Sequence, residues 1–209
     1  LSVPRSPRWL VRMGRLEEAY AAYRRAMTAS PVMAPTLSIP LARVCLDLGR
    51  LDEAKGNGEL GMASNPGAAH EVLARVALAR GDLETVETHL AQVAGDSVAE
   101  ANALLLGAEV QIRRERFGEA LARLDSAERL VAERGMDRPR DLSFLRGDAL
   151  ARLGRHAEAA VAFEREIADH PSNRQAYARL AIVYGLLQRT YGDVDRLLAR
   201  MFSASPSAE

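Results

Sequence analysis

The heptapeptide Leu48-Gly49-Arg50-Leu51-Asp52-Glu53-Ala54 decides how this sequence folds, because the chain repeats it with small changes. Close copies stand at residues 13–19 and 153–159, and weaker copies stand at residues 80–86 and 114–120. The third residue of the phrase recurs every 32 to 39 residues. A sequence period near 34 residues is typical of helix–turn–helix repeat proteins, in which each helical hairpin packs on its neighbours. The phrase therefore predicts an array of helical hairpins.

Small, aromatic and proline residues recur at fixed distances on either side of the phrase. Small residues let the two helices of a hairpin approach closely, glycine allows the left-handed conformation that ends a helix, and proline stops the second helix. The residues that carry the pattern are Gly14, Ala19, Tyr23, Ala26 and Pro31; Leu41, Ala42, Gly49, Ala54 and Pro66; Leu73, Ala74, Gly81 and Leu90; Ala108, Ala120, Leu124 and Ala127; Gly147, Leu150, Gly154, Ala159, Phe163 and Pro171; and Tyr177, Leu180, Ala181 and Tyr184. In the fourth repeat Glu115 stands where glycine is usual.

This pattern resembles the tetratricopeptide repeat family over nearly the whole chain. The resemblance implies an all-α fold, a right-handed superhelical solenoid of about five to six helical hairpins. It also implies a single array over residues 1–202, with repeats at about 1–33, 34–66, 67–99, 100–138, 139–171 and 172–202. We expect the serine-rich residues 203–209 to form a disordered tail.

The second repeat departs from the pattern at two places. Gly56, Gly58 and Gly61 fall inside its second helix, where they indicate either close helix packing or a hinge. Pro40 falls inside its first helix, so we expect that helix to start late, with Ser38 as its cap.

The wider spacing between the fourth and fifth repeats indicates one longer helix. We expect that helix to run through residues 129–134 and to end at Gly135, with Pro139 starting the next helix.

The composition excludes several classes of partner and site. Acidic and basic residues balance at 28 each, so no overall positive charge recruits nucleic acid. No run of about 18 apolar residues predicts a membrane span. Cys45 is the single cysteine, which excludes an internal disulfide framework. Lys55 is the only lysine beside many arginines, a usage typical of a GC-rich bacterial genome.

No catalytic, metal or cofactor site is predicted. The histidines His70, His89, His156 and His170 are scattered without metal-ligand spacing, and we expect polar surface roles for them. Cys45 is expected to be a buried, inert thiol. The glycines from Gly56 to Gly61 follow no strand, so they do not form a dinucleotide-binding loop.

Candidate binding residues follow from the resemblance, because the first helix of each repeat lines the concave groove of the family. The residues that transfer to groove positions are Arg8, Arg12, Arg43, Asp47, Arg75, Glu109, Arg113, Asp148 and Arg152. The groove is expected to be basic over the first three repeats and acidic over the next two. The alternative is a network of solvated ion pairs between neighbouring helices.

The resemblance therefore implies a non-enzymatic scaffold that binds a protein or peptide in this groove. Two alternatives stay open. The chain begins without methionine, which favours a fragment or processed form, so it could be an accessory domain of a larger bacterial protein such as a sulfatase-like enzyme. It could also self-assemble, for example as a homodimer through its terminal repeats, where Trp9 is expected to be exposed.

Overall fold

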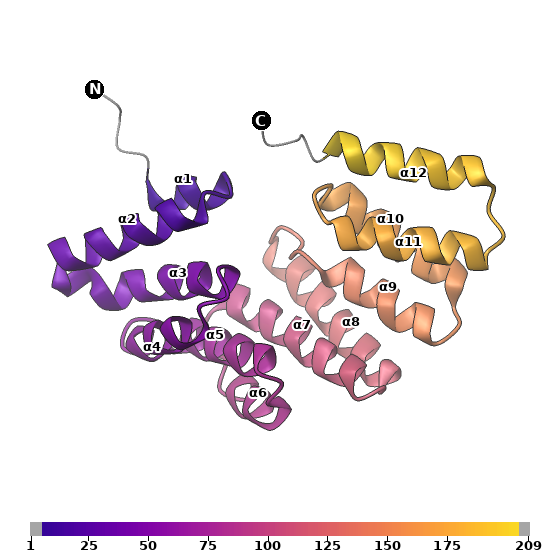
Figure 1. Ribbon diagram of the computed structural model, residues 1–209. Helices are drawn as coiled ribbons and strands as arrows, with labels where there is room; N and C mark the ends of the chain where they lie inside the picture. Colours follow the sequence, from indigo (N-terminus) through magenta and orange to yellow (C-terminus); the bar gives the residue numbers. More distant parts are fainter. Residues whose placement is uncertain (1–5, 205–209) are drawn as a thin grey trace. The chain divides into compact units, whose positions relative to one another are not determined.

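The computed structural model describes residues 6–204 and contains α-helices and one short 3₁₀ helix, with no strand in that range (Figure 1). The predicted all-α class with its helical hairpins is confirmed. The chain divides into two compact parts, an N-terminal unit of residues 1–103 and a C-terminal unit of residues 104–209. The boundary falls inside helix α7 (Ser97–Arg113).

The N-terminal unit contains three helical hairpins and the start of α7. Its elements are α1 (Pro7–Arg12), α2 (Leu16–Ala29), η1 (Pro31–Met33), α3 (Ala34–Asp47), α4 (Leu51–Gly61), α5 (Pro66–Ala79) and α6 (Leu83–Leu90). Buried Leu41, Cys45 and Ala54 join α3 to α4, and half-buried Trp9 packs against the same core. Trp9 is thus less exposed than the sequence suggested.

The C-terminal unit contains the end of α7 and five further helices. These are α8 (Phe117–Arg134), α9 (Leu142–Arg152), α10 (His156–Asp169), α11 (Arg174–Leu186) and α12 (Tyr191–Ala204). Buried Phe163, Tyr177 and Leu197 join α10, α11 and α12. Of the predicted tail, residues 203 and 204 end α12, and residues 205–209 lie outside the described residues.

The repeated heptapeptide builds the turn between the two helices of each hairpin. Gly49 has a φ of 72°, and the N–H of Arg50 donates to the carbonyl of Cys45 at 2.8 Å. This bond closes the end of α3 by the usual left-handed glycine cap. Glu115 adopts the same conformation, with a φ of 60°, although it has a side chain. The turn therefore follows from the sequence around it even where glycine is missing.

The helix α4 runs without a break through Gly56, Gly58 and Gly61. Two of these glycines allow α4 to pack closely on its neighbours. A Cβ atom at Gly61 would clash with the side chain of Ile39. A Cβ atom at Gly58 would lie 3.1 Å from the side chain of Leu73. These contacts favour close packing of α4 on its neighbours. Gly56 has open space around it, and no contact explains it.

The expected late start of the helix with Pro40 is wrong, because α3 begins at Ala34 and continues through the proline. Ser38 is buried and does not cap the helix; its hydroxyl donates to the carbonyl of Pro35 at 2.7 Å. Ser64, from the turn before α5, donates to the same carbonyl at 2.7 Å. These two hydroxyl bonds stabilise the turn of α3 that precedes Pro40.

The long helix α8 ends at Arg134, and Gly135 has a φ of 60°, so this part of the prediction is confirmed. The next helix does not start at Pro139, as predicted, but at Leu142. The segment between them stays non-helical because Arg138 and the backbone of Asp141 are bonded to side chains of other helices.

Candidate functional site

The N-terminal unit holds a fully buried carboxylate between two arginines that the sequence placed in the groove. Glu71 on α5 accepts from Arg43 Nη2 of α3 at 3.0 Å through its Oε2, and from Arg75 Nε through its Oε1. The Arg43 and Arg75 side chains are 42% and 38% exposed. Each guanidinium is thus held by Glu71 on one side and reaches solvent on the other.

Beside Arg43 lies an open pocket of about 450 Å³, lined by residues of α3, α5 and the start of α7. Asn65 caps α5 by accepting from the N–H of Ala68 at 3.0 Å, and its Nδ2 donates to Asp96 Oδ2 at 2.8 Å. This amide therefore links the starts of two helices and fixes one wall of the pocket.

Asp96 in the same pocket is held as a carboxylate. The backbone N–H of Ala99, at 3.0 Å, is the strongest influence that lowers the pKa of Asp96, and burial acts in the opposite direction. Asn65, the N–H of Val98 and the charge of Arg43 lower it further. The pocket thus keeps a negative group beside a positive one.

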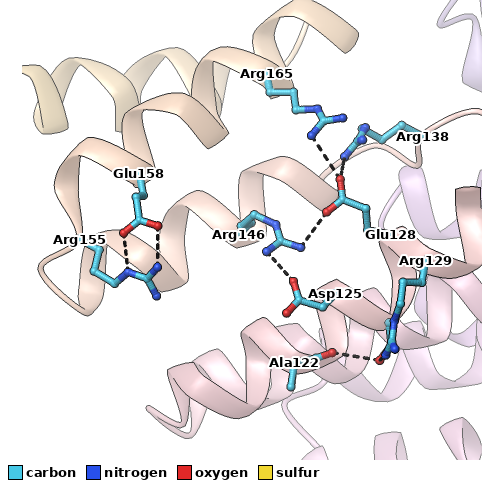
Figure 2. Close-up of polar contacts among 10 residues, drawn as sticks. Ala122, Asp125, Glu128, Arg129, Arg138, Arg146, Arg155, Glu158 and Arg165 are labelled. Carbon is cyan, nitrogen blue, oxygen red and sulfur yellow. Dashed lines mark hydrogen bonds and ion pairs between the residues drawn. The ribbon is translucent and has the colours of Figure 1, made fainter.

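The C-terminal unit gathers three arginines around one carboxylate (Figure 2). Glu128 of α8 accepts from Arg138 Nη1 at 2.7 Å, from Arg146 Nη2 at 3.0 Å and from Arg165 Nη1 at 3.3 Å. Burial alone would raise the pKa of Glu128, but the three arginines outweigh it and lower the pKa. Asp125 binds Arg146 at 2.7 Å, so these charges are satisfied among themselves.

Sequence reasoning missed this cluster. Its members lie on α8, α9, α10 and the segment before α9, and only the fold brings them together. None of them occupies a groove position of the family pattern. The cluster joins α8, α9 and α10 through one carboxylate, so it is an ion-pair network that stabilises the packing of these helices.

The other predicted groove residues of the C-terminal unit also form ion pairs. Arg113 binds Glu109 at 2.8 Å within α7, and Arg152 binds Asp148 at 3.2 Å within α9. Arg179 Nε lies 3.6 Å from Asp148 as well. Only the pair of Arg179 with Asp148 joins two helices, as the ion-pair alternative expects, whereas the other two pairs lie within one helix. A role of the four predicted residues in binding a partner stays a prediction.

The remaining predicted residues, Arg8, Arg12 and Asp47, are exposed on α1 and at the end of α3. Arg8 lies close enough to Tyr23 to act on its pKa, which burial raises and Arg8 lowers. The structure does not gather these three around the pocket of α3, α5 and α7.

Two histidines that the sequence separates by 19 residues lie side by side in the N-terminal unit. His70 Nδ1 of α5 and His89 Nδ1 of α6 are 3.0 Å apart, so one ring donates a hydrogen bond to the other. Burial and the nearby His70 lower the pKa of His89. Both rings are half-buried, which differs from the expected surface roles. Within residues 6–204, no three His, Cys, Asp or Glu side chains gather as metal ligands would.

Cys45 is buried, as predicted, and it is a free thiol. Burial, with a smaller contribution from Glu53, raises its pKa to about 11. A thiol with this pKa stays protonated near neutral pH and is a poor nucleophile. No helix of the described range is both long and apolar enough to span a bilayer.

Two family models, both described as tetratricopeptide repeat, match the chain. One matches residues 105–174 and 144–189, and the other matches residues 35–55 and 67–92. No curated protein sequence matches the chain.

Three solved structures illustrate the likeness of fold. The APC/C hetero-tetramer Cut9–Hcn1 has a TM-score of 0.77 at 15% identity, and the match covers 97% of this chain but only 39% of that chain. TTC0263 of Thermus thermophilus, described as a thermophilic TPR protein, has a TM-score of 0.69 at 21% identity and covers 85% and 94% of the two chains. YrrB, described as a TPR protein with an unusual peptide-binding site, has a TM-score of 0.50 at 16% identity and covers 89% and 93%. At these identities the likeness concerns the fold.

Proposed function

Because the chain belongs to the tetratricopeptide repeat family, we propose that it is a non-enzymatic scaffold that binds a protein or peptide partner through the first helices of its hairpins. The peptide-binding site in the description of YrrB, a protein of similar fold, supports this assignment. A preformed surface that holds its side chains in place suits binding, because little ordering cost remains when the partner arrives.

The observation that carries the proposal is the pocket beside Arg43. Its lining mixes a guanidinium, a carboxylate and an amide with apolar groups such as Val98, which is 55% exposed. Glu71 positions Arg43, and Asn65 positions Asp96. A concave site with a few fixed polar groups beside apolar ones is suited to binding a ligand.

Selection of random displayed peptides on the purified protein tests the proposal. We expect wild-type protein to enrich a set of related peptides, and the Arg43→Ala variant to bind them more weakly by fluorescence anisotropy. Arg155→Ala is the matched control, because Arg155 is an exposed arginine paired with Glu158 in the C-terminal unit. Failure to enrich any peptide, or equal binding by both variants and wild type, would count against the proposal.

Self-association through the C-terminal hairpin is a second candidate, favoured by apolar side chains on its surface. Ile182 and Leu186 of α11 are 59% and 58% exposed, and Phe202 of α12 is 69% exposed. An exposed group of this kind is a typical contact between copies. Light scattering across a concentration series tests it: a dimer should be weakened by Phe202→Ser, and a wild type that is monomeric throughout excludes the idea.

A further inference from the structure

The pocket of the N-terminal unit contains an unusual acceptor, the backbone carbonyl of Thr36. In an α-helix this carbonyl accepts from the N–H four residues later, and that residue here is Pro40, which has no N–H. Thr36 and Pro40 both line the pocket. The carbonyl of Thr36 therefore lacks its usual helical donor, and Thr36 is one of the residues that line the pocket.

A donor comes from the same helix. Arg43 lies two turns after Thr36 on α3, and side chains of a helix lean towards its N-terminus, so the guanidinium extends towards Pro40. One of its nitrogens, Nη2, binds Glu71 at 3.0 Å. The side chain is still 42% exposed, which leaves further N–H groups for a ligand.

The charges around the pocket balance. Arg43 and Asp96 line the pocket with opposite charges, and Arg43 is also paired with the buried Glu71, which Arg75 pairs as well. A ligand with a full charge would meet a group of its own sign at short range, because Arg43 and Asp96 line the same pocket. A neutral ligand that both donates and accepts meets no such repulsion.

We infer that this pocket takes the primary amide of an asparagine or glutamine side chain of the partner. This inference rests on the proposed function, since it names the group that the pocket recognises. A primary amide shows its C=O and one N–H side by side on one edge, whereas a trans peptide bond shows them on opposite edges. The C=O accepts from Arg43, and the NH₂ donates to the Thr36 carbonyl and to Asp96. Val98 contacts the methylene groups.

Three synthetic peptide libraries test the inference. They are randomised except for one central residue, which is fixed as glutamine, glutamate or alanine, and each is passed over the immobilised protein. We expect the glutamine library to be retained most strongly. The key variant is Pro40→Ala, which returns an N–H to the helix and thereby occupies the Thr36 carbonyl without changing any charge.

Pro40→Ala should raise the melting temperature and yet weaken binding of the glutamine library about five-fold, the effect of one lost hydrogen bond. This pairing of greater stability with weaker binding separates a binding role from a structural one. The inference is overturned if the glutamate or alanine library is retained as well as the glutamine library, or if Pro40→Ala leaves the preference unchanged. In those cases retention of peptides by wild type still supports the proposed function. If wild type retains no library, both the inference and the proposed function fail.

Discussion

Glu71 in the N-terminal unit and Glu166 in the C-terminal unit are both fully buried carboxylates, but different kinds of group satisfy them. Burial of a charge is costly unless the charge is paired and hydrogen-bonded. Glu71 is paired with Arg43 and Arg75, whose outer sides reach solvent. The carboxylate thus positions two side chains at the surface, and one of them, Arg43, lines the pocket.

Glu166 instead holds the backbone. It accepts from the N–H of Asp141 at 3.0 Å, from the N–H of Phe144 at 3.3 Å and from Asn173 Nδ2 at 2.9 Å. These bonds fix the start of α9 against α10 and α11. A buried glutamate thus orients surface side chains in the N-terminal unit, whereas in the C-terminal unit a buried glutamate holds the backbone between helices.

The largest effect should come from removing the internal carboxylate. Glu166→Ala leaves two backbone N–H groups and the Asn173 amide without their acceptor, and we expect a loss of about 3 kcal/mol in the free energy of unfolding. Urea unfolding followed by circular dichroism measures it. Glu164→Ala is the control on the same helix, because Glu164 is exposed and bonds only the Tyr184 hydroxyl at 2.7 Å. Similar losses in both variants would contradict the role of Glu166.

Removal of Glu71, which orients the two surface arginines, should lower the free energy of unfolding less than removal of Glu166. In Glu71→Ala the two arginines can turn to water, since each is more than a third exposed, and we expect a loss of about 1 kcal/mol. The same urea titration measures this, with the exposed Glu84→Ala of α6 as the control. A loss equal to that of Glu166→Ala would show that the two carboxylates are equivalent after all.

The comparison also shows which parts of the fold a sequence can predict. The turn at Gly49 and the end of α8 at Gly135 are predicted correctly, because a left-handed glycine cap depends on neighbouring residues. The start of α9 is predicted three residues too early, because Glu166 fixes that backbone from 25 residues away. The predicted start of α3 is wrong for the same kind of reason, since Ser64 of the next hairpin supports it.

The candidate site could likewise be predicted only in part from the sequence. The repeat pattern identifies Arg43 and Arg75 but not their shared partner Glu71, because ion pairing between helices does not follow from helix positions alone. The contact of His70 with His89 depends on how α5 and α6 pack. The arginines around Glu128 come from two helices and a connecting segment, so no single stretch of sequence contains a signal for them.

A smaller effect is expected at two turns of the same left-handed geometry, one formed with glycine and the other with a residue that has a side chain. Gly49 has a φ of 72° and open space around it, so Gly49→Ala tests the backbone alone, at a cost of about 1 kcal/mol. Glu115 has a φ of 60°, and Glu115→Gly should stabilise the chain by about 0.5 kcal/mol, since part of the gain is offset in the unfolded state. Thermal unfolding of both variants beside wild type measures the two opposite shifts; shifts of the same sign would contradict the shared geometry.

The smallest effect is a difference in how the two units respond to acid. The pKa of His89 is lowered from 6.5, so the unfolded chain takes up this proton more readily than the folded chain. The stability that His89 contributes is complete above pH 6.5 and is lost as the pH falls from there through the lower pKa of the folded state. The pKa of Glu128 is lowered from 4.5, so its contribution in the C-terminal unit is lost only as the pH falls below 4.5. Trp9, the single tryptophan, reports the N-terminal unit, and its fluorescence in urea measures the difference in stability of that unit between about pH 7.5 and about pH 5.5. His89→Asn should reduce that difference, and an unchanged difference would assign the acid response to other groups.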